Sequence, residues 1–335
     1  MNEEIQLTPA SLDAMLKPYA ESQRGRSIFQ LVNSFALYIA AWFLTLWLVS
    51  VSYWLALPAA FLSASLLIRL FIIFHDCGHG SFFRSRRANG VIGAIVGVMT
   101  LTPYQAWRRR HAAHHAATGN LDVEDRSLGT INTLTVNEYR ALSPGRRFLY
   151  RVYRHPFVIL GIGALFHFIV SQRFPQPVPM SWRHIERRSV WWTNVGIVLS
   201  VTAAVFLFGW KNFLLVQIPI TCISSAMGMW LFFVQHQFDN AYWEHTPPWN
   251  YHDASLYGSS HYDLHPVLHW FTGNIGFHHV HHLNSRIPNY RLKECLDSNP
   301  PLQVAPKLRL FESLRCATLA LWDEERRTLV SFRNA

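Results

Sequence analysis

The stretch His75-Asp-Cys-Gly-His79 directly follows the long apolar run Trp54–Phe74, so histidines stand where an apolar segment meets polar chain. Two further clusters follow it, His111-Ala-Ala-His114-His115 and His278-His-Val-His281-His282. The histidines of the first cluster are four positions apart, and the other two clusters have i, i+3, i+4 spacing. On a helix these offsets put imidazoles on one face, close enough to share a metal ion. Three such clusters in one chain predict a metal centre.

The composition is that of a membrane protein. The 335 residues are 50% hydrophobic and only 15% charged, whereas soluble domains average about 25% charged residues. The net charge of +10 is explained by basic loops beside a membrane, and because no nucleic-acid-binding motif is present we expect no nucleic-acid partner. The four cysteines form no C-x-x-C pair, which argues against a thiolate metal site.

Four apolar stretches are long enough to span a bilayer, which takes about 20 residues. They are 33–52, 54–74, 190–210 and 212–234, and the short connection within each pair predicts two helical hairpins. Two shorter stretches, 90–103 and 156–170, are expected to lie at the membrane surface. If the three clusters build one site, neither short stretch can cross, because a crossing would separate the clusters. The sequence therefore predicts an all-α integral membrane protein with four transmembrane helices and a cap that holds the metals.

The basic residues predict the orientation. Arginines are concentrated on the histidine side, and the opposite side keeps two small loops with only Lys211. By the positive-inside rule the metal site, the cap and both termini are expected to be cytoplasmic. The arginines on which this depends are Arg84, Arg86, Arg87, Arg108, Arg109, Arg110, Arg183, Arg187 and Arg188.

Eight clustered histidines exceed the needs of one zinc ion, which takes three or four protein ligands, and they indicate two metal ions. No Glu-x-x-His pair is present, unlike in soluble di-iron carboxylate bundles. A pair of irons beside a lipid phase suits activation of dioxygen against an unreactive C–H bond. Spacing alone leaves zinc and copper open.

These motifs resemble those of the membrane fatty acid desaturase family. Besides the three boxes at 75–79, 111–115 and 278–282, the likeness includes the run Gly273-Asn-Ile-Gly-Phe277 before the third box and the flanks Gly119-Asn-Leu-Asp122, Val234-Gln-His-Gln-Phe238 and Arg286-Ile-Pro-Asn-Tyr290. The three residues between the histidines of the first box and the intact His278 favour bacterial acyl-lipid desaturases of the Δ12 (ω-6) or Δ5 type over acyl-CoA and front-end desaturases.

The resemblance implies one desaturase domain over residues 1–335, in a bacterial inner membrane. It implies a di-iron centre that uses O2 and two electrons to place a cis double bond in an acyl chain of a membrane glycerolipid. A separate electron donor such as ferredoxin is implied as partner. The implied catalytic metal ligands are His75, His79, His111, His114, His115, His278, His281 and His282, and His236 is implied as an additional metal ligand.

Some alternatives stay open at this point. A related di-iron lipid hydroxylase or ketolase shares the same boxes, and a membrane metal transporter is a different class, although its ligands should lie near the membrane midplane. His279 competes with His278 for the register of the third box and is expected to lie behind the ligands. Asp76, Asp122 and Asn274 are candidates to orient ligand imidazoles, with turns or helix caps as the other explanation. The arginines Arg108 to Arg110 meet lipid phosphates, an acidic donor or only solvent.

Overall fold

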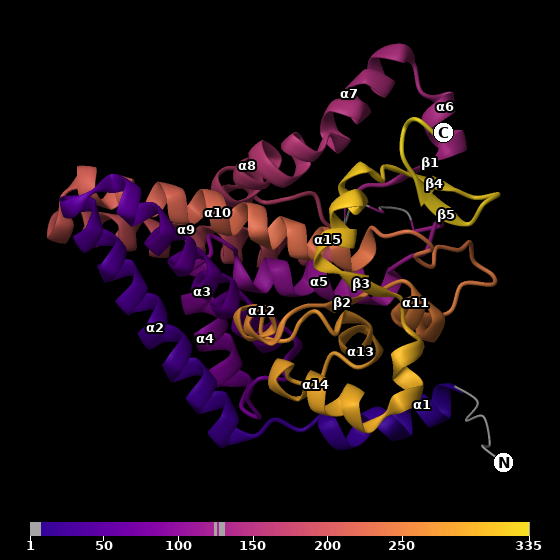
Figure 1. Ribbon diagram of the computed structural model, residues 1–335, viewed down its shortest axis with the longest axis horizontal. Coiled ribbons are helices and arrows are strands. Elements are labelled where there is room, and N and C mark those ends of the chain that lie inside the picture. Colours follow the sequence, from indigo (N-terminus) through magenta and orange to yellow (C-terminus); the bar gives the residue numbers. More distant parts are fainter. Residues whose placement is uncertain (1–7, 124–125, 127–130, 335) are drawn as a thin grey trace.

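The computed structural model describes residues 8–123, 126 and 131–334. Within them, four helices are long and apolar enough to cross a membrane. They are α2 (Arg24–Val51), α3 (Tyr53–His79), α9 (Arg183–Phe208) and α10 (Trp210–His236). These helices gather on one side of the molecule, and the shorter elements form a cap on the other (Figure 1). The predicted four spans and two hairpins are confirmed.

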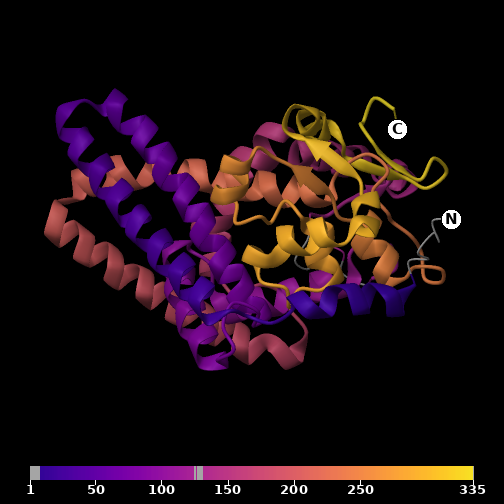
Figure 2. The same ribbon diagram turned by 60° about the horizontal axis from the view of Figure 1, so that its bottom comes forward.

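The two hairpin turns are short for identifiable reasons. Only Ser52, in an extended conformation, separates α2 from α3. Gly209 separates α9 from α10 and adopts a φ of +79°, a conformation that side-chain-bearing residues rarely take. Both turns lie at the end of the molecule opposite the cap (Figures 1 and 2).

The end of α3 sets the position of the first histidine box. The helix stops at Gly80, which has a φ of +72° and donates its N–H to the carbonyls of Asp76 and Cys77. A left-handed glycine after the last helical residue is a common way to end a helix. His75 and His79 therefore occupy the last turns of a buried membrane helix, where the chain enters the cap.

The two shorter apolar stretches do not cross. The first forms α4 (Arg86–Met99), which packs against α3 and α9. The second forms η2 (Val158–Ile162) and α8 (Gly163–Ile169), and the chain bends by 62° between the preceding helix α7 (Pro144–Arg154) and this segment. The start of α9 meets α5 (Tyr104–Ala117), where Ser189 Oγ accepts hydrogen bonds from the N–H groups of Gln105 and Ala106. Because α9 begins beside α5, the segment between them returns to the side it left.

The cap consists of short helices and strands that pack around α5. Its helices are α1 (Pro9–Leu16), α6 (Val136–Ala141), α11 (Tyr251–Tyr257), α12 (Pro266–Phe271), α13 (His278–Leu283), α14 (Asn289–Ser298) and α15 (Leu310–Ser313), with single turns η1 (Lys17–Tyr19), η3 (Ser171–Arg173), η4 (Met180–Trp182), η5 (Pro300–Val304) and η6 (Leu314–Thr318). One small sheet has the order β1 (Leu134–Thr135), β4 (Leu321–Asp323), β5 (Thr328–Val330), and β2 (His261–Asp263) pairs in parallel with β3 (Lys307–Arg309). These strands are an addition to the expected all-helical fold, which remains mainly helical. Both α1 and β5 lie at the cap end (Figure 2).

Helix α3 is the centre of the membrane part, since it packs against α2, α4, α5 and α10 and is buried over most of its length. The other spans expose large apolar side chains on their outer faces, such as Trp47 on α2 and Phe206 on α9, which is 88% exposed. In water such a surface would be costly, and in a bilayer it is the expected lipid contact.

Candidate metal centre

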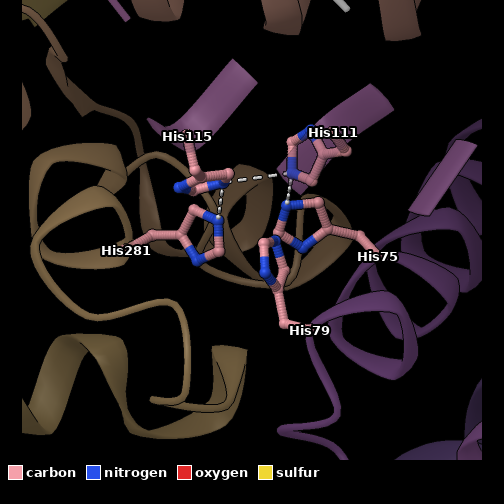
Figure 3. Close-up of side chains that lie close together, drawn as sticks. All are labelled: His75, His79, His111, His115 and His281. Carbon is pink, nitrogen blue, oxygen red and sulfur yellow. Dashed lines mark hydrogen bonds between the residues drawn. The ribbon is translucent and has the colours of Figure 1, made fainter. Parts of the chain in front are cut away.

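Five histidines from three helices converge on one point. His75 and His79 come from α3, His111 and His115 from α5, and His281 from α13, and one ring nitrogen of each lies within 4.8 Å of the others. Figure 3 shows the five rings turned toward a common centre. These three helices are far apart in the sequence. Their histidines meet because α3 and α13 both lie beside α5.

A second group of four histidines lies next to the first. It contains His114 from α5, His236 at the end of α10, and His278 and His282 from α13, again with ring nitrogens within 4.8 Å of one another. All nine histidines that the sequence singles out as ligand candidates, His236 included, are thus brought together in two groups.

The histidines of one box do not all share one group, so the simple expectation of one shared face is wrong for the second and third boxes. In the second box His111 and His115 join the first group and His114 joins the second. Successive helical residues are about 100° apart around the axis, so positions i+3 and i+4 point in directions that differ by about 100°. The i, i+3, i+4 spacing therefore lets one helix contribute histidines to both groups.

The donor set of both groups fits divalent metal ions. Nε2 atoms crowd together at 3.0 Å between His111 and His75 and at 3.0 Å between His114 and His236. The Nε2 atoms of His79 and His282 are buried without any hydrogen-bond partner. A buried polar atom without a partner is costly unless something else binds it, and a metal ion at the centre of each group would do so.

The protonation state of the cap histidines is the one that ligands need. Burial holds the pKa values of His111, His115 and His281 well below their usual range, and neighbouring imidazoles add to the effect. The same holds for the pKa values of His278 and His282 in the second group. The rings are therefore neutral at physiological pH, and a neutral ring offers a lone pair to a metal.

Two ligand candidates are oriented by hydrogen bonds on their other ring nitrogen. His75 Nδ1 donates to the Oδ1 atom of Asp76 at 3.1 Å, and His236 Nδ1 donates to the carbonyl of Gly258 at 3.2 Å. Each bond leaves Nε2 as the free acceptor that faces its group. The expectation for Asp76 is thus confirmed. Gly258 carries no sequence signal that would have revealed this contact.

The expectation that Asp122 and Asn274 orient ligands is wrong, and the turn explanation holds for both. Asp122 lies at the surface, where it accepts hydrogen bonds from His245 Nδ1 at 2.6 Å and the backbone of Thr246 at 2.7 Å. Asn274 occupies a turn with a φ of +58°. His279 belongs to neither group and lies beside His261, behind the ligands as expected.

Trp107 closes one side of the first group. Its ring stacks on His111 with centroids 4.3 Å apart and an interplanar angle of 19°. It also lies so close to Gly78 that a Cβ atom there would come within 2.7 Å of the indole. This close approach explains why a glycine stands beside His79 in the first box.

A cavity of about 500 Å³ opens onto both groups. His75, His111 and His278 line it at the metal level. From there it extends between α3, α10 and α8, and most of its other lining residues are apolar or small. On α10 the lining runs from Gln235 to Thr221, a rise of about 21 Å along a helix. Its size is within the range of about 300–1,000 Å³ typical of ligand sites.

A basic surface lies where α5 packs against the start of α9. Its exposed or partly exposed members, called here the arginine surface, are Arg108, Arg109, Arg183, Arg187 and Arg188. Glu186 is the one acidic residue between 180 and 192, and it is buried within 3.5 Å of the Arg110 guanidinium. Arg108 reaches the first box directly, because its Nε donates to the carbonyl of Gly78 at 2.9 Å.

The family profile described as "Fatty acid desaturase" matches residues 50–306. A protein of Bacillus subtilis (strain 168) named "Fatty acid desaturase" is 42% identical over 322 residues, covering 96% of this chain and 90% of the relative. The "sn-1 acyl-lipid omega-3 desaturase (ferredoxin)" of Synechocystis sp. is 27% identical and covers 79% of this chain and 71% of its own length. The "sn-1 oleoyl-lipid 12-desaturase" of Anabaena variabilis is 25% identical, with coverages of 75% and 71%. With nine histidines in two groups at the ends of membrane helices, this chain belongs to the fatty acid desaturase family and is an oxidoreductase of that family.

Proposed function

We propose that this protein uses O2 and two electrons to introduce a cis double bond into an acyl chain of a membrane glycerolipid. The observation that carries the proposal is the meeting of two all-histidine groups with one largely apolar cavity between the spans. An acyl chain fits such a cavity in shape and polarity. Because the cavity lies between membrane helices, a lipid substrate can enter it from the bilayer.

We propose iron as the metal and the nine histidines as its ligands, five in the first group and four in the second. Imidazole binds iron, zinc, copper and nickel, and an oxidation that uses dioxygen requires a redox-active ion. Two bound irons would supply the activation of O2 and the acceptance of hydrogen from the acyl chain. The protein holds neutral rings in place, and Asp76 and the carbonyl of Gly258 fix the orientation of His75 and His236.

In this proposal the residues of the cavity wall exclude water and position the acyl chain. Leu67, Ile68 and Phe71 on α3 face the chain and exclude water, which would otherwise react at the metals. Trp107 and His75 at the metal level limit how far a methylene can approach. Holding the reacting carbon in one position is worth several powers of ten in rate.

The lipid-linked form of the substrate is favoured by two observations. The cavity lies among membrane-spanning helices, where a phospholipid chain can arrive laterally. The names of the Synechocystis and Anabaena relatives describe acyl-lipid and oleoyl-lipid substrates. We rank the Δ12 position ahead of Δ5 and Δ9, following the spacing of the first box.

We propose that a small acidic electron carrier such as ferredoxin delivers the electrons at the arginine surface, as the name of the Synechocystis relative indicates for that protein. In the same proposal the cap, both termini and the metal centre face the cytoplasm, and the protein resides in a bacterial inner membrane as one desaturase domain. The concentration of arginines at the cap end of the spans supports this orientation.

The test is to express the chain in a host without polyunsaturated lipids and to map double bonds by mass spectrometry. Membranes are then supplied with isotopically labelled phospholipid or labelled acyl-CoA in separate assays, and His114→Ala serves as the inactive control. A new double bond in the labelled phospholipid is expected. Desaturation of acyl-CoA alone would overturn the lipid assignment, and oxygen retained as a hydroxyl group would identify a hydroxylase.

A further inference from the structure

A second cavity borders the second histidine group. It has a volume of about 620 Å³, and His114 and His236 line it, both from the second group. Its remaining wall comes from the cap: the end of α5 and its following turn, the segment before α9, and the chain after α10. The proposed reaction, as described above, involves only the first cavity.

Three described residues line both cavities: Ile131, Pro177 and Phe232. These three residues, called here the partition, belong to the walls of both cavities, so the two spaces are adjacent there. Phe232 lies one helical turn before His236 on α10, with its ring 5.4 Å from the ring of His114 and 5.7 Å from that of His236. The partition therefore stands directly against the second histidine group.

We propose that the two cavities are the two halves of one acyl channel, and that Phe232 is the residue past which the chain bends and which sets the position of the double bond. This inference rests on the proposed function. The methyl-terminal half of the chain occupies the first cavity, which runs along α10 as far as Thr221. The half next to the ester occupies the second cavity, and the carbons between them pass Phe232 beside the metal ligands.

The surroundings of each cavity indicate which end of the acyl chain it holds. The rim of the second cavity includes Pro177, Val178 and Pro179, which directly precede the turn that starts the third span. Phe174 and Met180 on either side of them are 62% and 75% exposed, so this rim is apolar and lies where α9 enters the membrane. That is the depth at which a phospholipid ester is found.

The first cavity also has polar residues in its wall, but their hydrogen-bonding groups are engaged with one another. Arg110 Nη2 donates to Gln172 Oε1 at 2.9 Å, Gln172 Nε2 contacts His167 Nε2 at 2.8 Å, and Arg110 also meets Glu186. An ester carbonyl placed there would have to displace one of these buried partners. Polar side chains of the second cavity, such as Thr118 and Gln237, are engaged as well, so the placement of the ester end rests on the position of the second cavity beside the start of the third span.

Labelling of the full-length protein in nanodiscs tests the direction of the chain. The probes are two phospholipids that carry a photoreactive diazirine, one beside the methyl end of an acyl chain and one beside its ester. The methyl-end probe is expected to label peptides of α10 between Thr221 and Gly228, and the ester-side probe those containing Thr118 or Val178. Ester-side labelling around Arg110 and Gln172 would overturn the proposal.

Substitutions at Phe232 test the partition. Phe232→Ala should spread the double bond over neighbouring positions, and Phe232→Trp should lower desaturation about tenfold or more and remove methyl-end labelling of α10, because a misplacement of about 1 Å can cost about 100-fold in rate. Phe206, exposed to lipid on α9, is the matched control, and its Ala and Trp variants should behave as the wild type. If the Phe232 and Phe206 variants give the same labelling and the same double-bond position, Phe232 has no such role.

The two proposals fail in different ways. If the wild type labels as expected but forms no double bond in any lipid, the channel stands and the proposed reaction is wrong. If the wild type desaturates phospholipid and the labelling pattern differs, the reaction stands and the channel is wrong. Photolabelling does not require bound iron. It would therefore still test the role of Phe232 in a variant that had lost its metal.

Discussion

Asp76 joins the first histidine box to the segment that follows the third. Its Oδ1 atom accepts a hydrogen bond from Nδ1 of His75 at 3.1 Å, and its Oδ2 atom accepts two from Asn289, at 2.6 Å from the backbone N–H and 2.8 Å from the side-chain amide. A buried carboxylate with three donors is well stabilised, and it holds the imidazole ring of His75 at a fixed angle.

Replacement of this carboxylate should weaken metal binding without removing a ligand. Asp76→Asn is expected to lower iron affinity about 10- to 100-fold, the usual effect of losing the partner of a metal-bound histidine. Iron titration of the purified protein measures this, and Asp297→Asn on the exposed face of α14 is the matched control. An unchanged iron affinity would show that Asp76 only supports the fold.

Metal content is the second prediction. Two all-histidine groups predict close to two irons per chain, measured by elemental analysis of protein purified from iron-replete cells. Dialysis against a chelator should abolish desaturation, and iron should restore it. Full activity with zinc alone would contradict the assignment, because zinc does not take part in electron transfer.

Single ligand variants form the third prediction. His114→Ala and His281→Ala remove one candidate ligand from each group and should abolish desaturation, while the protein stays in the membrane because its spans do not depend on the metals. His252→Ala, a histidine outside both groups, should retain activity. Near-normal turnover of either ligand variant would show that the ligand set is different.

The fourth prediction concerns the electron donor. With limiting ferredoxin, turnover should fall as salt rises, because screening within about 8–10 Å weakens steering by exposed charges. The double variant Arg187→Glu, Arg188→Glu on the arginine surface should show a lower rate at low salt and a weaker salt dependence. The same charge change at Arg146 on α7 and Arg333 after β5, both outside the arginine surface, is the control. Turnover independent of salt would mean that charges do not guide the donor.

A pH effect on stability is the fifth prediction. His245 Nδ1 donates to Asp122, and its Nε2 donates to Glu324 at 3.1 Å, and these hydrogen bonds raise its pKa. A raised pKa means that this contact stabilises the cap fully below the ordinary value of about 6.5, and that the stabilisation is lost as the pH rises through the folded value. Because the His245 side chain is half exposed, the thermal midpoint should fall by only about 2–4 °C. In His245→Gln this step should disappear.

Much of this arrangement could be predicted from the sequence because its signals are local. Runs of about 20 apolar residues define α2, α3, α9 and α10, and the requirement that His79, His111 and His236 meet excludes a crossing by α4 or α8. The nine histidines could be singled out by their spacing and by the resemblance to a family.

The rest depends on contacts between distant segments. The division of the second and third boxes between the two groups follows from how α5 and α13 face each other, and spacing alone does not reveal it. Asn289 lies in a flank that the sequence highlights, but its bond to Asp76 requires α14 to lie beside α3. Asp122 has the chemistry of a ligand partner, yet the turn after α5 turns it toward His245.

The shared boxes have a consequence for how the centre assembles. Helix α5 contributes to both groups, and so does α13, a helix of only six residues. An ion bound in one group would hold α5 and α13 in place. Because the same two helices carry histidines of the other group, binding of the first ion would order the site of the second. We therefore expect such a centre to fill cooperatively. Protein molecules that hold a single iron should be rare at every stage of loading, and partly reconstituted samples should be mixtures of empty and fully loaded enzyme.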